Sequence, residues 1–200
     1  MILDEVSLKQ AVESLAKVDE DLMRIFARVG TPPLWARPPG FPALVRIILE
    51  QQVSLASAHA AYQRLAETIP QMDAQDFLEL DDATLKKIGF SRQKTGYTRI
   101  LARSILSGEL DLEGLADLDD DNARNILMSL KGIGPWTADI YLLMALRRAD
   151  IWPVGDLALA QAVRRVKFLD SIPNPARMEE IAEPWKPWRA AAARLLWHYY

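Results

Sequence analysis

The stretch 129-SLKGIGPWTADIYLLMALRRADIWPVGD-156 holds the features that decide the fold. Gly132 and Gly134 flank a single isoleucine between two segments whose apolar residues follow a helical spacing. The chain has only nine glycines, and two so close together favour a tight bend with backbone angles that other residues resist. The stretch ends in Pro-Val-Gly and a lone aspartate, Asp156, directly before another helical run. It therefore predicts two helices joined by a tight hairpin, followed by a loop that presents one carboxylate.

Length and composition bound the class of protein. The chain has 200 residues, 50% hydrophobic and 26% charged, as expected for one globular domain or two small lobes around a cleft. No apolar run approaches the roughly 18 residues that cross a bilayer, and the acidic N-terminus fits neither a secretory signal nor a transit peptide. The absence of cysteine excludes a disulfide and an iron–sulfur cluster, and the two histidines lack zinc-site spacing. We therefore expect a cytoplasmic protein that binds no membrane.

Net charge is only weak evidence about nucleic acid. The formal charge is −3 and the sequence pI is about 5.5, whereas a surface that binds phosphates is usually basic. However, residues 86–103 contain six lysines or arginines and no acid, while acids crowd residues 109–121. A negative net charge is therefore compatible with one basic face on the surface.

Apolar residues recur every three to four positions along nearly the whole chain, which predicts an all-α fold. The segment 30-GTPPLWARPPG-40 is expected to be a loop, because its prolines and glycines break helices. Ser54 and Ser91 are good helix N-caps, and Gly89 is a good C-cap. The expected helices span residues 8–29 with a break near Asp19, 41–51, 54–69, 73–80, 81–89, 91–106, 119–129, 135–148, 157–168 and 187–200.

The glycine bend suits the binding of an anion. Pro135 is favoured at the first helical position, because its missing N–H would be unpaired there anyway. Backbone N–H groups bared by Gly132 and Gly134 beside a helix N-terminus can hold a phosphate, and Lys131 adds a positive charge. Such contacts position a duplex without reading its sequence. The alternative is an ordinary corner between two helices.

Asp156 and the aromatic residues near the C-terminus each have two interpretations. Asp is a favoured N-cap, so Asp156 can simply cap the following helix, or it can also face a cleft beside Gly155. The segment 182-AEPWKPWRAAAARLLWHYY-200 contains three tryptophans that are either core residues or plates for a flat cation, a stack that gains about 0.5–2 kcal/mol. Trp136, directly after the bend, would be a further plate.

Four segments in order resemble the HhH-GPD DNA glycosylases. The hairpin and aspartate loop, 127-LMSLKGIGPWTADIYLLMAL-146 and 150-DIWPVGD-156, resemble that family's helix–hairpin–helix and catalytic loop. The segments 46-RIILEQQVSLASAHA-60, 88-IGFSRQKTGYTRILA-102 and 185-WKPWRAAAARLLW-197 are similar to its wedge region, its G-[LF]-S-x-x-K helix and its C-terminal signature. The resemblance is greatest to the AlkA-like 3-methyladenine DNA glycosylase II branch, in a compact form without the N-terminal β domain of larger members.

The resemblance implies a two-lobed, all-helical fold and a role for each matching residue. Residues 1–40 would pack with the C-terminal lobe, residues 41–149 would form the lobe with the wedge and the hairpin, and residues 150–200 would carry the catalytic loop and C-terminal helices. Asp156 would be the catalytic carboxylate, and Gln52 and Val53 the wedge that replaces a flipped nucleotide. The phosphate grip would consist of Lys131, Gly132, Ile133, Gly134 and Thr137, with Na⁺ or K⁺ on the backbone of Leu130 and Gly132. The base pocket would be lined by Trp136, Ile140, Leu157, Trp197 and His198.

The implied activity is hydrolysis of the N-glycosidic bond of alkylated purines in double-stranded DNA, by a monomer without a catalytic cofactor. A fixed carboxylate would stabilise the cationic sugar in the transition state. Strand-cleaving members have a lysine where this chain has Trp136, so a monofunctional enzyme is expected. Some relatives have pocket tyrosines where this chain has Ile140 and Leu157, which implies a more aliphatic pocket.

Three alternatives stay open on the sequence. The first is the same fold acting on another lesion, such as hypoxanthine, ethenoadenine, an oxidised base or a mispaired base. The second is a non-catalytic module that binds damaged DNA through the hairpin alone. The third is a helical interaction protein whose glycine bend is only architecture, which salt-sensitive DNA binding would rule out.

Overall fold

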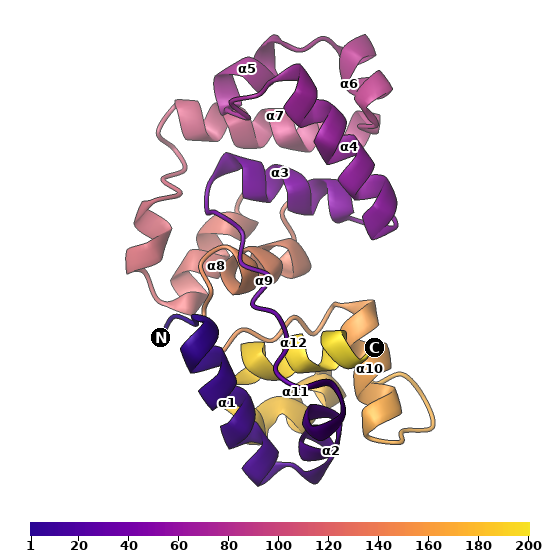
Figure 1. Ribbon diagram of the computed structural model, residues 1–200. Helices are drawn as coiled ribbons and strands as arrows, with labels where there is room; N and C mark the ends of the chain where they lie inside the picture. The colour runs from indigo at the N-terminus through magenta and orange to yellow at the C-terminus, as the bar shows by residue number, and fades with distance from the viewer. The chain divides into compact units, whose positions relative to one another are not determined.

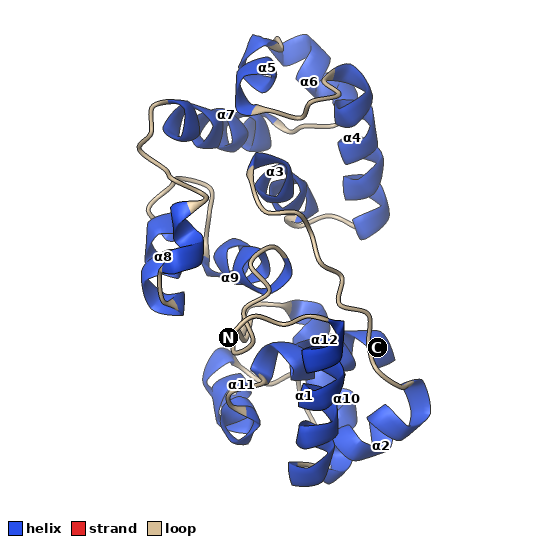
Figure 2. Cartoon of the chain, turned by 60° about the vertical axis from the view of Figure 1, so that its left-hand side comes forward, coloured by secondary structure: helices blue, strands red, loops and turns tan.

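The computed structural model describes residues 1–200 as an all-helical chain (Figure 1). It contains twelve α-helices and two short 3₁₀ helices, and the single β-like feature is an isolated bridge between Ile2 and Arg148. Figure 2 accordingly shows helices and loops without a strand. The all-α fold class expected from the sequence is confirmed. No helix is long and apolar enough to cross a bilayer.

The chain forms two compact units, each built around its own core. Unit 1 comprises residues 1–36 and 142–200, and unit 2 comprises residues 37–141. Residues 142–149, expected in the central lobe, belong to unit 1 because the backbone ties them to both ends of the chain. Leu3 N–H donates to the Arg147 carbonyl at 2.7 Å, and Ala149 N–H donates to the Met1 carbonyl at 3.1 Å. Ala190 N–H in turn donates to the Ala149 carbonyl at 3.0 Å.

Unit 2 is organised around α3, Phe41–Glu50, whose apolar side chains are nearly all buried. Helices α4, Leu55–Thr68, and α7, Arg92–Leu106, pack against it. Ser54 and Ser91 cap these two helices, and Gly89 ends α6 in a left-handed conformation, as predicted. The remaining elements are α5 (Ala74–Glu79), α6 (Asp82–Ile88), the 3₁₀ helix η1 (Gly114–Asp117), α8 (Asp120–Met128) and the first residues of α9 (Pro135–Met144).

Unit 1 is organised around α12, Arg189–Tyr199, whose residues 190–196 are all buried. Helices α1, Glu5–Val18, α2, Glu20–Val29, and α10, Leu157–Val166, pack against it. Asp19 ends α1 and caps α2, so the predicted break at this residue is confirmed. The remaining elements are α11 (Pro175–Ala182) and the 3₁₀ helix η2 (Glu183–Trp185).

Four helix bounds differ from expectation. The first helix begins at Glu5, because Asp4 and Ser7 form a capping box. Helix α9 ends at Met144 instead of near Arg148, since Arg147 has a left-handed backbone with φ 55° and the chain turns toward the N-terminal residues. Helix α10 ends at Val166, two residues before Phe168 adopts φ 52°. Helix α12 begins at Arg189, two residues after the expected Pro187.

Helix α11 was not expected, although its start carries a local signal. Asn174 caps it by accepting the Arg177 N–H at 2.9 Å, and Pro175 stands at the first helical position. Both are recognised helix-start residues.

Candidate nucleic-acid interface and carboxylate site

The hairpin between α8 and α9 needs one of its two glycines for its own fold. Gly132 has φ 100°, and a Cβ built on it would lie 2.1 Å from Cγ of Tyr97. The tyrosine ring therefore packs directly on the Gly132 backbone. Gly134 has an ordinary backbone angle, and a Cβ there would meet nothing within 4 Å. Gly134 thus leaves open surface beside the start of α9.

The other predicted phosphate-grip residues divide into exposed and buried ones. Lys131 is exposed, next to Gly132 at the tip of the hairpin. The side chains of Ile133 and Thr137 are buried, with 5% and 2% exposure, so they hold the hairpin against unit 2 from inside. The Ile133 N–H donates to the Leu130 carbonyl at 3.1 Å, and the Ala138 N–H donates to the Gly134 carbonyl at 3.0 Å.

Gln51 links the hairpin to the predicted wedge. It is the C-cap of α3, and its side-chain Nε2 donates to the Gly132 carbonyl at 3.0 Å and to Oγ1 of Thr137 at 2.9 Å. Lys94 fixes the same end of α3 by donating to the Leu49 carbonyl at 2.7 Å, and partial burial lowers the pKa of this lysine. Wedge and hairpin are therefore parts of one hydrogen-bonded assembly.

The predicted wedge residues lie at the sharp turn between α3 and α4. Gln52 is exposed and has a left-handed backbone with φ 55°, and Val53 is 46% exposed. Leu55, which the sequence reasoning did not single out, is 73% exposed at the start of α4. Two neighbouring aliphatic side chains thus project from this turn, where a water-exposed loop normally carries polar residues.

A groove of about 460 Å³ runs between this turn and the hairpin. Its lining is mostly polar and includes the amino groups of Lys94 and Lys131. Its principal lining residues are Gln51, Gln52, Lys94, Tyr97, Lys131 and Gly134. Within the basic run 86–103, Lys94 and Arg99 are engaged with partners of unit 2: Lys94 with the Leu49 carbonyl, and Arg99 with Asp82 at 2.6 Å and the Leu80 carbonyl at 3.0 Å.

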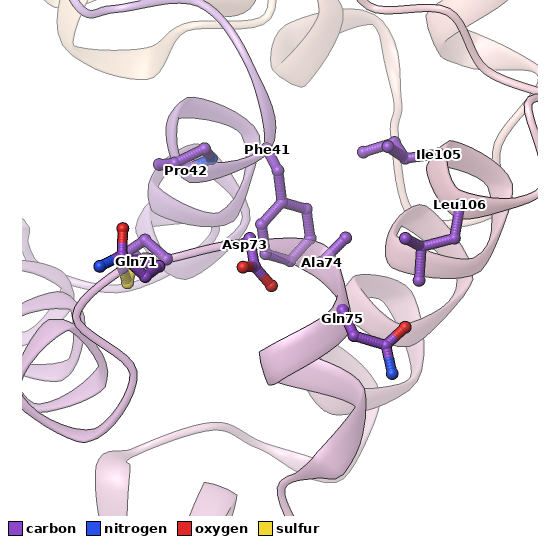
Figure 3. A pocket seen from close by; sticks show the side chains of 9 residues that line it. Phe41, Pro42, Gln71, Asp73, Ala74, Gln75, Ile105 and Leu106 are labelled. Atoms are coloured by element: carbon purple, nitrogen blue, oxygen red, sulfur yellow. The ribbon is translucent and has the colours of Figure 1, made fainter.

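A second pocket in unit 2, of about 480 Å³, is lined mainly by apolar side chains and has a single ionisable one (Figure 3). Phe41, Pro42 and Ala74 give it apolar walls, with Ile105 and Leu106 on α7. Its single ionisable side chain, Asp73, accepts the Asp76 N–H at 2.8 Å as the N-cap of α5. None of the predicted site residues lines it.

In unit 1, Asp156 is the N-cap of α10 and at the same time a partner of α12. Its Oδ1 accepts the Leu159 N–H at 2.7 Å and the indole N–H of Trp197 at 3.2 Å. Asp156 is therefore a helix cap, as one of its two interpretations predicted. Its side chain nevertheless remains half-exposed. The second donor, from a helix 41 residues away in sequence, fixes the carboxylate in one orientation.

The structure places the predicted base-pocket residues on both units. Leu157 and His198 in unit 1 are exposed, and Trp197 is half-buried. Trp136 and Ile140 lie on the part of α9 that belongs to unit 2, where Trp136 is half-buried and Ile140 is 3% exposed.

The remaining C-terminal tryptophans are tied to the fold. Trp185 is a core residue, 1% exposed, whose indole N–H donates to Asp19 at 2.8 Å. Its ring also packs edge-on against Trp152, with centroids 5.4 Å apart. Trp188 is the half-buried N-cap of α12.

Comparisons with known proteins agree with this architecture. The model of the HhH-GPD superfamily of base excision DNA repair proteins matches residues 45–187. The chain belongs to this superfamily.

Among its relatives is the alkylbase DNA glycosidase-like protein mag2 of Schizosaccharomyces pombe, 26% identical over 196 residues that make up 94% of this chain and 92% of mag2. The putative DNA-3-methyladenine glycosylase YfjP of Bacillus subtilis is 29% identical over 165 residues, 78% of this chain but 58% of YfjP. Among solved structures, 3-methyladenine DNA glycosylase (Mag1) of S. pombe in complex with abasic DNA is similar with a TM-score of 0.89 and 26% identity. That match covers 94% of this chain and 95% of Mag1.

Proposed function

We propose that the chain is a DNA glycosylase of base excision repair that hydrolyses the N-glycosidic bond of alkylated purines in double-stranded DNA. The observation that carries the proposal is the Asp156 carboxylate, half-exposed in front of α10 and held by the N–H groups of Leu159 and Trp197. Two donors and a helix N-terminus set a negative charge in place before any reaction begins. The names of the S. pombe and B. subtilis relatives support the same activity.

The chemistry follows from the charge of the substrate. N-alkylation of a purine gives it a positive charge, so it departs as a neutral base with the electrons of its glycosidic bond. Positive charge then develops on the sugar, and the Asp156 carboxylate stabilises it. A water oxygen bonds to the anomeric carbon, and its proton passes to the Asp156 carboxylate. The substrate therefore needs little acid catalysis, which agrees with a site built around a carboxylate.

The turn after α3 supports base flipping. A base inside a duplex is out of reach, and its extrusion costs about a few kcal/mol, least where pairing is already weakened. Gln52 and Val53, exposed at this turn, would fill the space that the flipped nucleotide leaves. The exposed Leu55 adds a second apolar side chain to this wedge.

The hairpin would hold a phosphate of the damaged strand. The open surface at Gly134 and the exposed Lys131 suit an anion, and the contact would position DNA without reading sequence. A bound Na⁺ or K⁺ would add positive charge there. The carbonyls of Leu130 and Gly132 each accept one hydrogen bond, from Ile133 and Gln51, and a carbonyl oxygen has a second lone pair for a cation. These backbone groups therefore fit the predicted ion.

Trp136 stands where strand-cleaving relatives carry a nucleophilic lysine, so the product would be an abasic site in an unbroken strand. An indole cannot form a Schiff base with the sugar aldehyde. Borohydride should therefore trap no covalent complex with DNA. We further expect the enzyme to act as a monomer in the cytoplasm, on double-stranded DNA with damaged bases.

The test is release of free base from duplex DNA, analysed by chromatography. The substrates are methylated duplex DNA and matched duplexes with a single hypoxanthine, ethenoadenine, 8-oxoguanine or mismatch. We expect release of 3-methyladenine and alkali-labile sites without spontaneous strand breaks. Release of a different base alone would reassign the lesion, and salt-sensitive DNA binding with no release at all would make the chain a binding module.

A further inference from the structure

The groove between the hairpin and the turn after α3 is lined without acidic residues. None of its lining residues is Asp or Glu, although the chain as a whole has more acidic than basic side chains. Of its two amines, Lys94 donates inward to the Leu49 carbonyl, whereas Lys131 is exposed and forms no ion pair. The groove is therefore suited to an anion rather than to a cation.

Tyr97 on α7 places its ring along this groove. The base of the ring packs on the Gly132 backbone, where an added Cβ would collide with Cγ and Cδ1 of Tyr97. Helical side chains lean toward the N-terminus of their helix, so residues four apart on one face meet. Gln93, one turn earlier on α7, accordingly reaches the far end of the ring, and its Nε2 donates to the Tyr97 hydroxyl at 2.7 Å. Both residues line the groove.

The Tyr97 hydroxyl has a proton without an acceptor in the protein. A phenolic hydroxyl can donate one hydrogen bond while it accepts another. Here the oxygen accepts the Gln93 amide, and no carbonyl or side chain accepts the hydroxyl proton. The amide also restricts where this proton can point, because it occupies one lone pair of the oxygen. An oriented donor beside a groove without acids is a binding element for an anionic oxygen.

We propose that the Tyr97 hydroxyl, aligned by Gln93, binds a second backbone phosphate of the damaged strand, between the phosphate on the hairpin and the flipped nucleotide. The proposal rests on the function proposed above and adds a phosphate site to it. The two sites are separate, since a Cβ at Gly134 would meet no atom within 4 Å and hence no atom of Tyr97. Lys131 lines the same groove and adds positive charge.

A neutral donor gives this contact its own signature. A lysine on a phosphate displaces counterions, so its loss changes the salt dependence of binding, whereas a hydroxyl neutralises no charge. Phosphate contacts fix the register of a protein on the strand without reading its sequence. Tyr97 therefore positions the damaged strand between hairpin and wedge, and it lowers the Kd by the same factor at every salt concentration.

The chain offers a conservative variant and a matched control. Tyr97→Phe keeps the ring that packs on Gly132 and removes only the hydroxyl. Tyr62 on α4 is another half-buried tyrosine of unit 2, but its ring lies 5.7 Å from the Arg46 guanidinium and lines no part of the groove. Tyr62→Phe therefore reproduces the loss of a tyrosine hydroxyl in general. Gln93→Leu removes the aligning amide alone.

The experiment measures binding of these variants to a duplex with an abasic-site analogue over a range of salt concentrations. We expect Tyr97→Phe to bind about 3- to 30-fold more weakly, with the melting temperature and the salt slope of the wild type. Gln93→Leu should lose part of this affinity, and the double variant no more than Tyr97→Phe alone. Wild-type affinity of Tyr97→Phe, an equal loss in Tyr62→Phe, or independent losses in the double variant would overturn the proposal.

A scan with single methylphosphonates, each replacing one charged phosphate oxygen of the damaged strand by a methyl group, locates the contact. At one position the wild type and Tyr97→Phe should bind alike, and at a neighbouring position the wild type and Gly134→Ala should bind alike. One position shared by both variants, or a Tyr97→Phe deficit at every position, would overturn the second site. The test needs no base release, so a wild-type protein that binds the duplex but frees no base would contradict the proposed function alone.

Discussion

The two hairpin glycines should respond differently to alanine, because Gly132 is needed for the fold whereas Gly134 is proposed to bind the phosphate. At Gly132 the new Cβ would lie 2.1 Å, 2.5 Å and 2.6 Å from three carbons of Tyr97, on a backbone with φ 100°. Carbon atoms in contact normally stand about 3.5–4.0 Å apart, so either the tyrosine or the hairpin has to move by more than an ångström. At Gly134 the new Cβ would meet nothing within 4 Å.

The expected loss of stability for Gly132→Ala has two parts. A left-handed backbone costs a residue with a Cβ about 1–2 kcal/mol, and overpacking against Tyr97 costs about 1–3 kcal/mol. The sum of about 2–5 kcal/mol corresponds to a melting temperature lower by roughly 4–20 °C for a chain of this size. Adding Tyr97→Ala removes two of the three close carbons but keeps Cβ at 2.6 Å, so it should relieve only part of the overpacking and leave the backbone part. For Gly134→Ala the expected change is within about 1 kcal/mol, of either sign.

The assays are thermal unfolding and equilibrium binding to a duplex with an abasic-site analogue. Gly132→Ala should have a lower melting temperature than the wild type. Gly134→Ala should melt like the wild type and bind the duplex at least about tenfold more weakly, since its methyl group would occupy the place of the proposed phosphate. Wild-type stability of Gly132→Ala would refute the role of Tyr97. Wild-type affinity of Gly134→Ala would refute the phosphate site.

Three further predictions concern single contacts. Lys131→Gln should weaken duplex binding equally across sequences and reduce the slope of log affinity against log salt by about 1, whereas an unchanged slope would mean that this amine touches no phosphate. Gln51→Leu leaves the Gly132 carbonyl without its side-chain donor and should cost about 1–3 kcal/mol in urea unfolding, with weaker DNA binding, whereas the wild-type midpoint would show that the two bonds are dispensable. Burial would raise the pKa of Asp19, but hydrogen bonds from Lys167 and Trp185 outweigh it and hold the pKa below the ordinary 3.8. The resulting stability is present above that ordinary pKa and lost as the pH falls through the lower folded value, so acid unfolding should be steeper in the wild type than in Asp19→Asn; equal acid profiles would contradict this.

Local sequence signals predicted most of the helices. Ser54 and Ser91 act as N-caps and Gly89 as a C-cap because capping depends on a residue and its immediate neighbours. The end of α9 was not predictable in this way. It depends on the hydrogen bonds that Leu3 N–H donates to the Arg147 carbonyl and that Ala149 N–H donates to the Met1 carbonyl, and no local pattern shows such long-range pairing.

The candidate site likewise combines residues that the sequence indicates locally with contacts that only the fold creates. Asp156, Gly134 and Lys131 stand out in the sequence through composition and spacing. Their partners do not: Tyr97 explains Gly132 only because its ring packs there, and Trp197 is recognised as a partner of Asp156 only when α10 and α12 come together.

The central claim is that the charge of Asp156 drives base loss, and replacement by asparagine tests it directly. Asparagine is as good an N-cap and can accept the same hydrogen bonds from Leu159 and Trp197, so Asp156→Asn removes charge with little change in structure. Single-turnover release of 3-methyladenine from methylated duplex DNA is measured for both proteins, with melting temperature and abasic-duplex binding as controls. The account predicts a loss of at least about 10²- to 10³-fold in rate, with both controls unchanged. Equal release by both proteins would mean that Asp156 is only a helix cap.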